Sequence, residues 1–372
     1  MDATIIGAGP IGCYVGYLLS KKGIQNTIVE EHKEIGRPEQ CTGLVSRNIE
    51  AIIEPSWYRK AVLNRVYGAV ISCGKQSFDV KAKDFKAYVF DRARFDKAIA
   101  EKAWDNGSEI LLNHSYTSHK QEEKGLKIRL NSGKKAKEIT SSLLIGADGP
   151  GSKVAKNAGL YGKRDFFIGN QVILKAKNPF FQKDKVYVFL DKRYSDGFFA
   201  WVVPIDEERA KVGLASLTKP AEYLERFLRD KFDNFVVEKR FGGVIPIYKK
   251  MPLQNRQKNV FLVGDAALHV KATSGGGVVN GMLAAKGLCE SVISGDFAYE
   301  KKIKEVRRNL WLHLMIRKKF NNMNDERTAA LLKSLNEKAA KEVILEKGDM
   351  DFPRKFIFKL LLSEPRLIKY IF

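Results

Sequence analysis

Short apolar runs separated by glycine-rich turns dominate the first part of the chain. The first run is Thr4-Ile-Ile6, and the second is Thr27-Ile-Val29. Between them, apolar residues recur at helical spacing from Ile11 to Lys22, and Gly23 follows as a stop signal. A strand, a helix and a second strand in this order are typical of a parallel sheet covered by helices.

The same pattern predicts elements along the rest of the chain. Strands are expected at 66–72, 77–80, 88–90, 109–112, 143–145, 166–175, 186–190, 197–204 and 211–216, with a hairpin or a three-stranded meander over 115–143. Helices are expected at 91–106, with Asp91 as the N-cap, and at 153–158, 220–232, 277–294 and through most of 298–372. We interpret 241–246 as a turn near the second group of strands.

Three of the glycines after the first run, Gly7, Gly9 and Gly12, have the G-x-G-x-x-G spacing. In this motif the first glycine makes a tight turn, the second lets the backbone approach a pyrophosphate, and the third lets the helix pack against the strand. Glu30 ends the second run about 20 residues later, where a carboxylate can accept hydrogen bonds from a ribose. These residues predict a dinucleotide site, although the same unit can fold without a ligand.

Two later apolar runs end in similar turns. The run at 143–145 leads into Gly146-Ala-Asp148-Gly149, and the run at 260–263 leads into Gly264-Asp265. The glycines at 275–277 then open a helix, where free amides can bind a phosphate or polarise a ring carbonyl. Repeated turns of this kind predict several contacts along one extended cofactor.

Charge and cysteine content narrow the possible partners. The chain has 372 residues, with 65 Lys and Arg against 43 Asp and Glu, and its net charge of +22 favours an anionic partner. No RNA-binding motif occurs and the basic residues are dispersed, so we expect no nucleic-acid partner. We expect no signal peptide, no run of 18 apolar residues occurs, and the four cysteines have no pairing or metal-ligand spacing. We therefore expect a cytoplasmic protein without a metal site.

Two features allow both a functional and a purely structural interpretation. Cys41 lies in a polar loop that continues from the second strand, and a loop cysteine is more often inert than reactive. Aromatic residues cluster within 166–217. They could form the wall of a site for an apolar substrate, but packing in a sheet core is the commoner use of aromatics.

Together these motifs resemble the flavoprotein fold shared by the aromatic hydroxylases and the geranylgeranyl reductases. The three turns are the signature of FAD binding in that fold and cover residues 1 to about 294. Within the group, the chain resembles the archaeal geranylgeranyl reductase family. The segments that carry this narrower resemblance are Glu34-Ile-Gly36-x-Pro38-x-x-Cys41-x-Gly43, Gly264-Asp-Ala-Ala-x-x-Val-Lys-Ala-Thr-x-Gly-Gly-Gly277 and Phe199-Ala-Trp201-Val-Val-Pro204.

The resemblance implies an α/β fold that consists of a Rossmann-like FAD-binding domain, an inserted and mostly antiparallel β substrate domain, and a helical C-terminal region. The expected FAD-binding domain comprises 1–61, 86–165 and 245–297. The β-rich substrate domain is expected at 62–85 and 166–244, and the basic helical region at 298–372.

The expected FAD contacts come from two sources. The motifs indicate Gly7, Gly9, Gly12, Glu30, Asp148, Asp265, Gly276 and Gly277. The resemblance, carried over by position, adds Ile11, Cys41, Thr42, Leu44, Arg92, Tyr116 and Val278. It also implies that the substrate binds at Phe199, Trp201 and Pro204.

The activity that the resemblance implies is saturation of C=C bonds in the geranylgeranyl chains of archaeal membrane lipids, with digeranylgeranylglycerophospholipid as the expected substrate. An isolated alkene is a poor hydride acceptor, so a proton has to reach the second carbon, and Cys41 is the candidate catalytic residue for its delivery. Ferredoxin, NAD(P)H or a quinol could supply the electrons. Two alternatives stay open: an FAD-dependent monooxygenase, and a non-catalytic basic membrane-surface or RNA-binding protein that keeps a relict flavin fold.

The end of the chain combines large apolar residues with cations, over 352–362 and again over 366–372. This mixture is typical of a helix that lies on an anionic membrane surface. The competing interpretation is a C-terminal helix that docks on the body of the protein or at a dimer interface.

Overall fold

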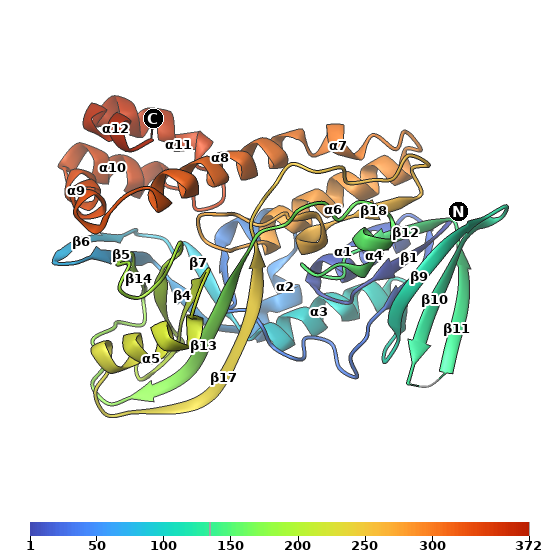
Figure 1. Cartoon of the computed structure of the whole chain (residues 1–372), viewed down its shortest axis with the longest axis horizontal. Helices are drawn as coiled ribbons and strands as arrows, with labels where there is room; N and C mark the ends of the chain where they lie inside the picture. The colour runs from blue at the N-terminus through green and yellow to red at the C-terminus, as the bar shows by residue number, and fades with distance from the viewer. Residues whose placement is uncertain (134, 372) are drawn as a thin grey trace.

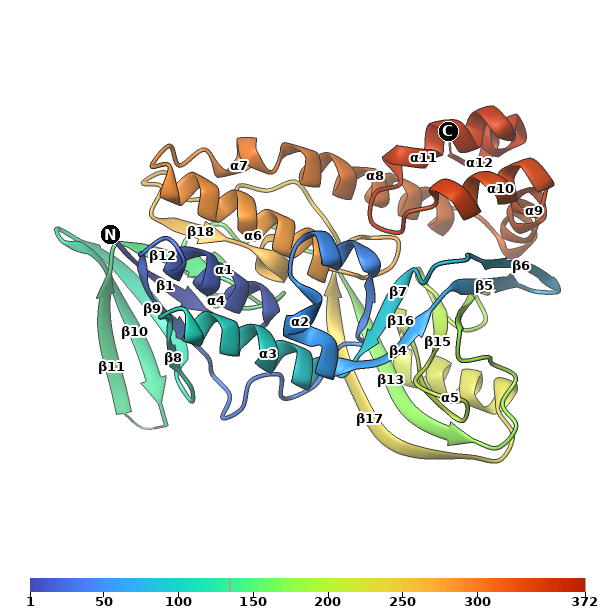
Figure 2. The same ribbon diagram turned by 180° about the vertical axis from the view of Figure 1, so that it is seen from behind.

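The computed structural model describes residues 1–133 and 135–371. The molecule contains two large sheets, a first one of five strands and a second one of seven, which lie toward opposite ends (Figures 1 and 2). The C-terminal helices lie above the second sheet (Figures 1 and 2). A long helix, α8 (Lys304–Asn321), extends from the first sheet region toward the C-terminal helices. The elements that carry the predicted cofactor motifs belong to the first sheet.

That first sheet is fully parallel, with the strand order β18-β12-β1-β2-β8. Its strands are Asp2–Ile6 (β1), Gln25–Val29 (β2), Glu109–Leu111 (β8), Leu143–Gly146 (β12) and Val260–Leu262 (β18). Three helices of this region are Pro10–Ser20 (α1), Arg92–Asp105 (α3) and Val278–Ile293 (α6). Helix α1 packs against both α3 and α6. The parallel pairing of β1 with β2, which α1 connects, confirms the predicted strand–helix–strand unit.

Two smaller antiparallel sheets flank the parallel one. The predicted meander over 115–143 is confirmed as Ser115–Glu122 (β9), Gly125–Ser132 (β10) and Lys135–Ser141 (β11). The other small sheet contains Leu44–Ser46 (β3), Val62–Val66 (β4) and Ala87–Phe90 (β7). Short helices Pro55–Tyr58 (α2) and Lys153–Asn157 (α4), and 3-10 turns at Arg47–Ala51, Arg59–Ala61 and Gly264–Ala267, complete this part.

The second large sheet has seven strands in the order β17-β13-β16-β15-β14-β5-β6. Its members are Gly68–Cys73 (β5), Gln76–Lys81 (β6), Phe166–Ala176 (β13), Lys185–Phe189 (β14), Ala200–Pro204 (β15), Arg209–Ser216 (β16) and Phe235–Pro246 (β17). All neighbours are antiparallel except β5 and β14. Helix α5 (Pro220–Lys231) packs on β13 and β16, and it buries Leu224, Phe227 and Leu228.

The prediction of a turn at 241–246 is wrong, because these residues belong to β17, a strand of 12 residues. Gly242 and Gly243 pair with Asn170 and Gly169 of β13. A Cβ atom on Gly242 would lie 2.6 Å from the carbonyl oxygen of Gly169, so the two backbones approach more closely than a side chain allows. The glycine pair therefore serves strand contact and not chain reversal.

The predicted helical C-terminal region is confirmed in the described residues. Its helices are Tyr299–Lys302 (α7), α8, Asp325–Leu335 (α9), Lys338–Lys347 (α10), Arg354–Ser363 (α11) and Ile368–Ile371 (α12), with a 3-10 turn at Pro365–Leu367. The helices from the end of α8 onward share a small core that includes Met323, Leu331 and Leu360, and α9 also packs on β5 and β6. None of the helices in the described part of the chain is both long and apolar enough to cross a bilayer.

Candidate functional site

The three predicted turns meet at one edge of the parallel sheet. Strands β1, β12 and β18 are neighbours, and parallel strands deliver their carboxyl ends to the same edge. Gly7 has a φ of +104°, and a Cβ atom there would lie 2.5 Å from the carbonyl oxygen of Ala147 in the second turn. Gly264 of the third turn packs against Ile11 at the start of α1. The turns therefore touch one another at this edge.

A cavity of about 500 Å³ opens at this edge. Of the predicted site residues, Gly7, Gly9, Glu30, Cys41, Arg92, Tyr116 and Asp148 line it. Gly12 and Ile11 lie behind it in α1, while Asp265 and Gly276–Val278 lie farther along the same strand edge. The sequence analysis missed further lining residues, among them His32, Glu39, Gln40, Asp96 and His114.

The glycines of the first turn have different surroundings. No protein atom lies within 4 Å of the position that a Cβ of Gly9 would take, so its backbone faces open space. A Cβ on Gly12 would lie only 2.0 Å from the carbonyl oxygen of Gly7. The turn is thus held closed at Gly12 and left open at Gly9, as a site for a pyrophosphate requires.

Glu30 projects from the end of β2 into the cavity. Its Oε2 accepts a hydrogen bond of 2.8 Å from the backbone amide of Ala8, and its Oε1 accepts one of 3.0 Å from the amide of His32. These bonds fix the carboxylate beside the first turn. Because each carboxylate oxygen can accept more than one hydrogen bond, acceptor capacity remains for sugar hydroxyls.

Asp148 has a structural role that the motif did not indicate. Its Oδ1 accepts a hydrogen bond of 2.6 Å from the Ser152 hydroxyl, and its Oδ2 accepts one of 3.0 Å from the amide of Val154. Burial raises the pKa of the Asp148 carboxyl, and the hydrogen bond from Ser152 opposes the rise. Asp148 therefore closes the second turn onto α4 while it lines the cavity.

Arg92 is one of the cations that line the cavity. Its guanidinium forms a two-pronged ion pair with Asp96 one turn along α3, at 3.0 and 3.1 Å. Asp91 accepts a hydrogen bond from the Arg94 amide, which confirms it as the N-cap of the same helix. Tyr116 lies beneath the cavity in β9, where its hydroxyl is 2.6 Å from Nδ1 of His119. The helix and the meander thus position two side chains that only the resemblance had indicated.

Asp265 follows β18 and faces the glycine-rich start of α6. Its Oδ1 lies 3.0 Å from the position of a Cβ on Gly277, so a side chain at Gly277 would crowd the carboxylate. Burial raises the pKa of Asp265 from 3.8 to about 6, and the Arg92 guanidinium opposes the rise. The carbonyl of Gly276 accepts a 3.1 Å hydrogen bond from the amide of Lys271, and Val278 begins α6.

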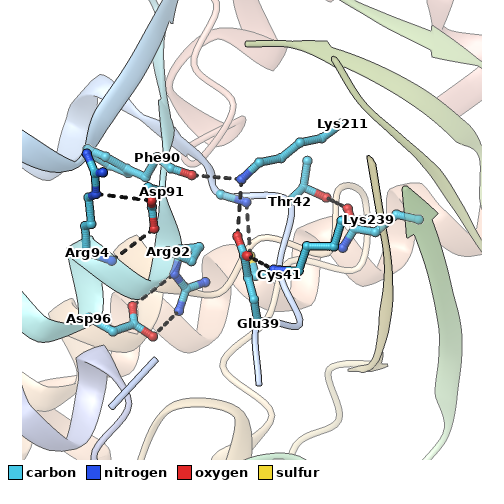
Figure 3. Close-up of polar contacts among 12 residues, drawn as sticks. Glu39, Cys41, Thr42, Phe90, Asp91, Arg92, Arg94, Asp96, Lys211 and Lys239 are labelled. Atoms are coloured by element: carbon cyan, nitrogen blue, oxygen red, sulfur yellow. Dashed lines mark hydrogen bonds and ion pairs between the residues drawn. The ribbon is translucent and has the colours of Figure 1, made fainter. Parts of the chain in front are cut away.

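The loop that carries Cys41 lies between the start of α3, which carries Arg92, and the strands that carry Lys211 and Lys239 (Figure 3). Cys41 is partly exposed and its Sγ accepts a hydrogen bond of 3.4 Å from the amide of Gly43. The Thr42 hydroxyl donates a 2.8 Å hydrogen bond to the Gln171 side chain of β13, and Leu44 begins β3. Cys41 and Thr42 therefore sit where the cofactor cavity approaches the second sheet.

A buried lysine supports this loop from the second sheet, and nothing in the sequence pattern indicated it. Lys211 in β16 is 1% exposed, and its ammonium donates a 2.9 Å hydrogen bond to the carbonyl of Phe90. It also pairs with Glu39 at 3.6 Å, while Lys239 of β17 contacts the same carboxylate at 2.5 Å (Figure 3). Burial lowers the pKa of Lys211, and Glu39 opposes this effect.

The predicted substrate residues lie on β15 or next to it. The rings of Phe199 and Trp201 meet edge to face at 5.9 Å, and Phe198 stacks on Phe199 at 4.2 Å. Both Phe199 and Trp201 are buried in a cluster with residues of β3 and β7. Pro204, at the far end of β15, accepts a hydrogen bond from Asn64 through its carbonyl. The structure brings Phe199 and Trp201 together and leaves Pro204 apart from them.

Comparison with known proteins identifies the family. A family described as FAD binding domain matches residues 1–294. The chain belongs to this family. FAD is therefore its cofactor, and the open Gly9 backbone, the Glu30 carboxylate and the cavity that continues to Cys41 fit an extended dinucleotide.

Individual relatives indicate which group within this family the chain resembles. An uncharacterized protein of Methanocaldococcus jannaschii is 30% identical over 97% of this chain and 95% of its own length. A digeranylgeranylglycerophospholipid reductase of Methanosarcina acetivorans is 28% identical over 90% of this chain and 88% of its own length. These matches confirm the resemblance to the archaeal geranylgeranyl reductases.

A solved structure confirms the fold over the whole chain. The geranylgeranyl bacteriochlorophyll reductase-like protein of Thermoplasma acidophilum superposes with a TM-score of 0.83. The match covers 100% of this chain and 99% of that one, at 22% identity. The predicted α/β class, with a Rossmann-like FAD-binding part, antiparallel sheets and C-terminal helices, is thereby confirmed.

Substitutions at two glycines separate cofactor binding from folding. In Gly9→Ala the new methyl group meets no protein atom, so the variant should unfold at the wild-type temperature but bind FAD roughly tenfold to hundredfold more weakly, because it blocks close approach of the pyrophosphate. In Gly12→Ala the methyl group clashes with Gly7, and thermal unfolding should occur at a clearly lower temperature. Flavin titration and calorimetry test both variants. Unchanged FAD affinity in Gly9→Ala would contradict the assignment.

The pKa of Asp265 makes the stability of the FAD-free protein depend on pH. Because the pKa is raised on folding, the folded state binds the proton more tightly, and stability falls as pH rises from about 4 to about 6. Asp265→Asn should therefore stabilise the FAD-free protein by roughly 3 kcal/mol at pH 7.5 and by less than about 1 kcal/mol at pH 4. Urea unfolding at both pH values measures this difference. The exposed Asp233→Asn serves as the control, and an equal effect of the two substitutions at pH 7.5 would refute the prediction.

Proposed function

We propose that the protein is an FAD-dependent reductase that saturates C=C bonds of geranylgeranyl chains in membrane lipid biosynthesis, with digeranylgeranylglycerophospholipid as its substrate. The observation that carries this proposal is the near full-length match to relatives named as reductases of that lipid. The cavity supports it, because Cys41 lines the cavity and the adjacent Thr42 is hydrogen-bonded to Gln171 of the second large sheet. The alternatives, a monooxygenase and a non-catalytic protein, have less support from the relatives.

When FAD is bound and reduced, it supplies a hydride. The task of the chain is to hold an apolar alkene against the cofactor and to exclude water. Phe199, directly before β15, and Trp201, on β15, provide an apolar surface, and the Trp201 Nε1 has no partner among the described residues. The side chain of Gln171, on β13 of the same sheet, accepts a hydrogen bond from Thr42 and so joins the sheet to the Cys41 loop. We infer that the alkene lies between Phe199 and the Cys41 loop.

Cys41 is the residue that we propose as the proton donor to the second alkene carbon. It lines the cofactor cavity, and the Gly43 amide fixes its sulfur through a hydrogen bond. Its other neighbours are cationic: Arg92 and Lys211 both interact with it electrostatically.

Replacement of Cys41 tests this role. Cys41→Ala should retain FAD absorbance but reduce the rate of alkene saturation roughly 100-fold or more, because general acid catalysis is worth about 10²–10⁴-fold. The assay incubates dithionite-reduced protein anaerobically with the prenyl lipid and detects added hydrogen pairs by mass spectrometry. Cys289→Ala, which removes a thiol buried behind α1, is the matched control. Wild-type rates in Cys41→Ala would exclude the thiol as the donor.

The same assay separates the reductase from its main rival. A reductase should saturate prenyl chains without oxygen. A monooxygenase on the same scaffold would instead consume NAD(P)H and oxygen and release a hydroxylated product. Comparison of ferredoxin, NAD(P)H and a quinol as donors in this assay would also identify the reductant, which we propose to be one of these three.

We further propose that α11 rests on an anionic membrane surface, where the lipid substrate resides. Its inner face packs in the C-terminal core through Leu360, whereas Phe358 is 70% and Leu362 is 66% exposed. These two residues lie one turn apart and therefore on the same face of the helix. The exposed Lys359 and Lys369 lie nearby in the sequence and supply positive charge.

Vesicle binding tests this surface. Phe358→Glu combined with Leu362→Glu should weaken binding to phosphatidylglycerol vesicles roughly tenfold to hundredfold, since two apolar side chains lose their insertion and two negative charges are added. Trp104→Glu, at a side chain that is 69% exposed on α3, should leave binding unchanged. Equal binding by wild type and the double variant in a sedimentation assay would refute the proposal.

A further inference from the structure

A second cavity, of about 370 Å³, lies between the antiparallel sheet and the C-terminal helices. Its lining residues differ from those of the cofactor cavity. One wall comes from the segment between β14 and β15, which includes Phe198, and from Leu217. The opposite wall comes from the end of α8, with Arg317 and Phe320, and from the start of α9. This cavity is a separate site on the side of the sheet that faces the helices.

Arg317 is the unusual group in this cavity. It is only 6% exposed, and burial lowers the pKa of its guanidinium to about 10. Its Nε donates a 2.9 Å hydrogen bond to the carbonyl of Ala272, and its Nη2 donates one of 2.6 Å to the carbonyl of Thr273. Neither partner carries a charge. Among the described residues, no carboxylate forms an ion pair with this guanidinium.

Two uncharged carbonyls do not balance a buried positive charge. A guanidinium has five N–H donors, and Nη1 of Arg317 has no hydrogen-bond partner among the residues that the structure describes. Burial of a charge without a counter-ion is costly, and an anion in the cavity would remove that cost. The fork of a guanidinium also matches the oxygens of a phosphate.

The remaining lining residues divide the cavity into polar and apolar parts. Asp196 and Asp325 are already engaged, since Asp196 accepts a hydrogen bond from Thr218 and Asp325 accepts one from the Lys192 amide. They can accept further hydrogen bonds from hydroxyl groups next to an anion. The apolar part consists of Leu190, Phe198, Leu217, Phe320 and Met323. A ligand that fills both parts carries a phosphate, nearby hydroxyl groups and a hydrocarbon segment.

The position of Arg317 connects this cavity to the cofactor side. Its guanidinium lies over the Phe198 ring at 4.4 Å and over the Phe199 ring at 5.6 Å. The ring of Phe198 also reaches the turn at Gly275, where a Cβ atom would lie 3.6 Å from it. A chain attached to a phosphate at Arg317 can therefore pass along the two phenylalanine rings toward the glycine-rich start of α6.

We propose that the cavity around Arg317 binds the phosphate headgroup of the lipid whose chains are reduced, an assignment that rests on the proposed reductase function. Arg317 acts as a specificity-determining residue: it anchors the anionic end of the substrate, while the phenylalanine pair guides the chain. The same residue holds Ala272 and Thr273, so headgroup binding and the cofactor loop share one side chain.

Binding of farnesyl phosphate and of farnesol to the oxidised, FAD-loaded protein tests this assignment, because the two probes differ only in the phosphate. In Arg317→Met the dissociation constant for farnesyl phosphate should rise roughly tenfold to hundredfold, while that for farnesol should change by less than about twofold. Arg308→Met, which removes an exposed cation of the same helix, is the matched control. If Arg317→Met weakens binding of both probes equally, or of neither, the proposal is overturned.

A second variant covers the possibility that loss of Arg317 disturbs the loop at Ala272. Asn321 lines the same cavity one helical turn after Arg317, so Asn321→Glu places a carboxylate beside the guanidinium without removing its hydrogen bonds. This variant should also bind farnesyl phosphate at least about fivefold more weakly than wild type. Unchanged binding would contradict the site.

Two further readouts sharpen this test. The first distinguishes a lipid headgroup from free phosphate as the anion, and the second distinguishes failure of the headgroup site from failure of the proposed reductase function. Inorganic phosphate should not displace farnesyl phosphate at equal concentration, and equal competition would overturn the assignment to a lipid headgroup. The binding assay involves no turnover. Loss of phosphate selectivity in Arg317→Met therefore supports the headgroup site even if prenyl chains are not reduced, whereas normal selectivity in an active reductase would refute the site alone.

Discussion

The close backbone contact between the first two glycine turns is the constraint on which the rest of the structure depends. Strands β1 and β12 are adjacent and parallel, so their turns emerge side by side, and the carbonyl of Ala147 occupies the space where a side chain of Gly7 would project. The third turn is locked to the same edge because Gly264 and Gly281 both pack against Ile11. Any side chain at these contacts would separate the turns, and the turns would no longer line one continuous cavity.

The second sheet meets this region through an apolar cluster around Phe199 and Trp201 and through electrostatic contacts to the Cys41 loop. Lys211 and Lys239 come from neighbouring parts of that sheet, and both contact Glu39 in the Cys41 loop. Burial of an ammonium group is costly unless it is paired, so these contacts strongly favour one position of the loop. The geometry around Cys41 therefore depends on charges supplied from residues that are about 170 and 200 positions away in the chain.

The C-terminal helices are tied to the third turn in a similar way. Lys271, shortly before the triple glycine, pairs with Asp351 at 2.5 Å, and His313 of α8 contacts the backbone of Asp351 and the hydroxyl of Thr273. Burial lowers the pKa of His313 to about 4, so this imidazole is neutral at physiological pH. Together with Arg317, these contacts place the helices directly on the loop that leads into α6.

Local sequence determined the cofactor motifs and most of the elements, because each depends on neighbouring residues. An apolar run followed by a glycine turn specifies a strand end within a few positions, and the N-cap at Asp91 needs only the amide of Arg94. Only the tertiary structure decided which distant residues meet. Lys211 and Arg317 resemble ordinary surface cations in the sequence, and their burial follows from contacts with Phe90 and with Ala272. Gly242 and Gly243 resemble a turn for the same reason, since the close approach of β13 that requires them is a long-range contact without a local signal.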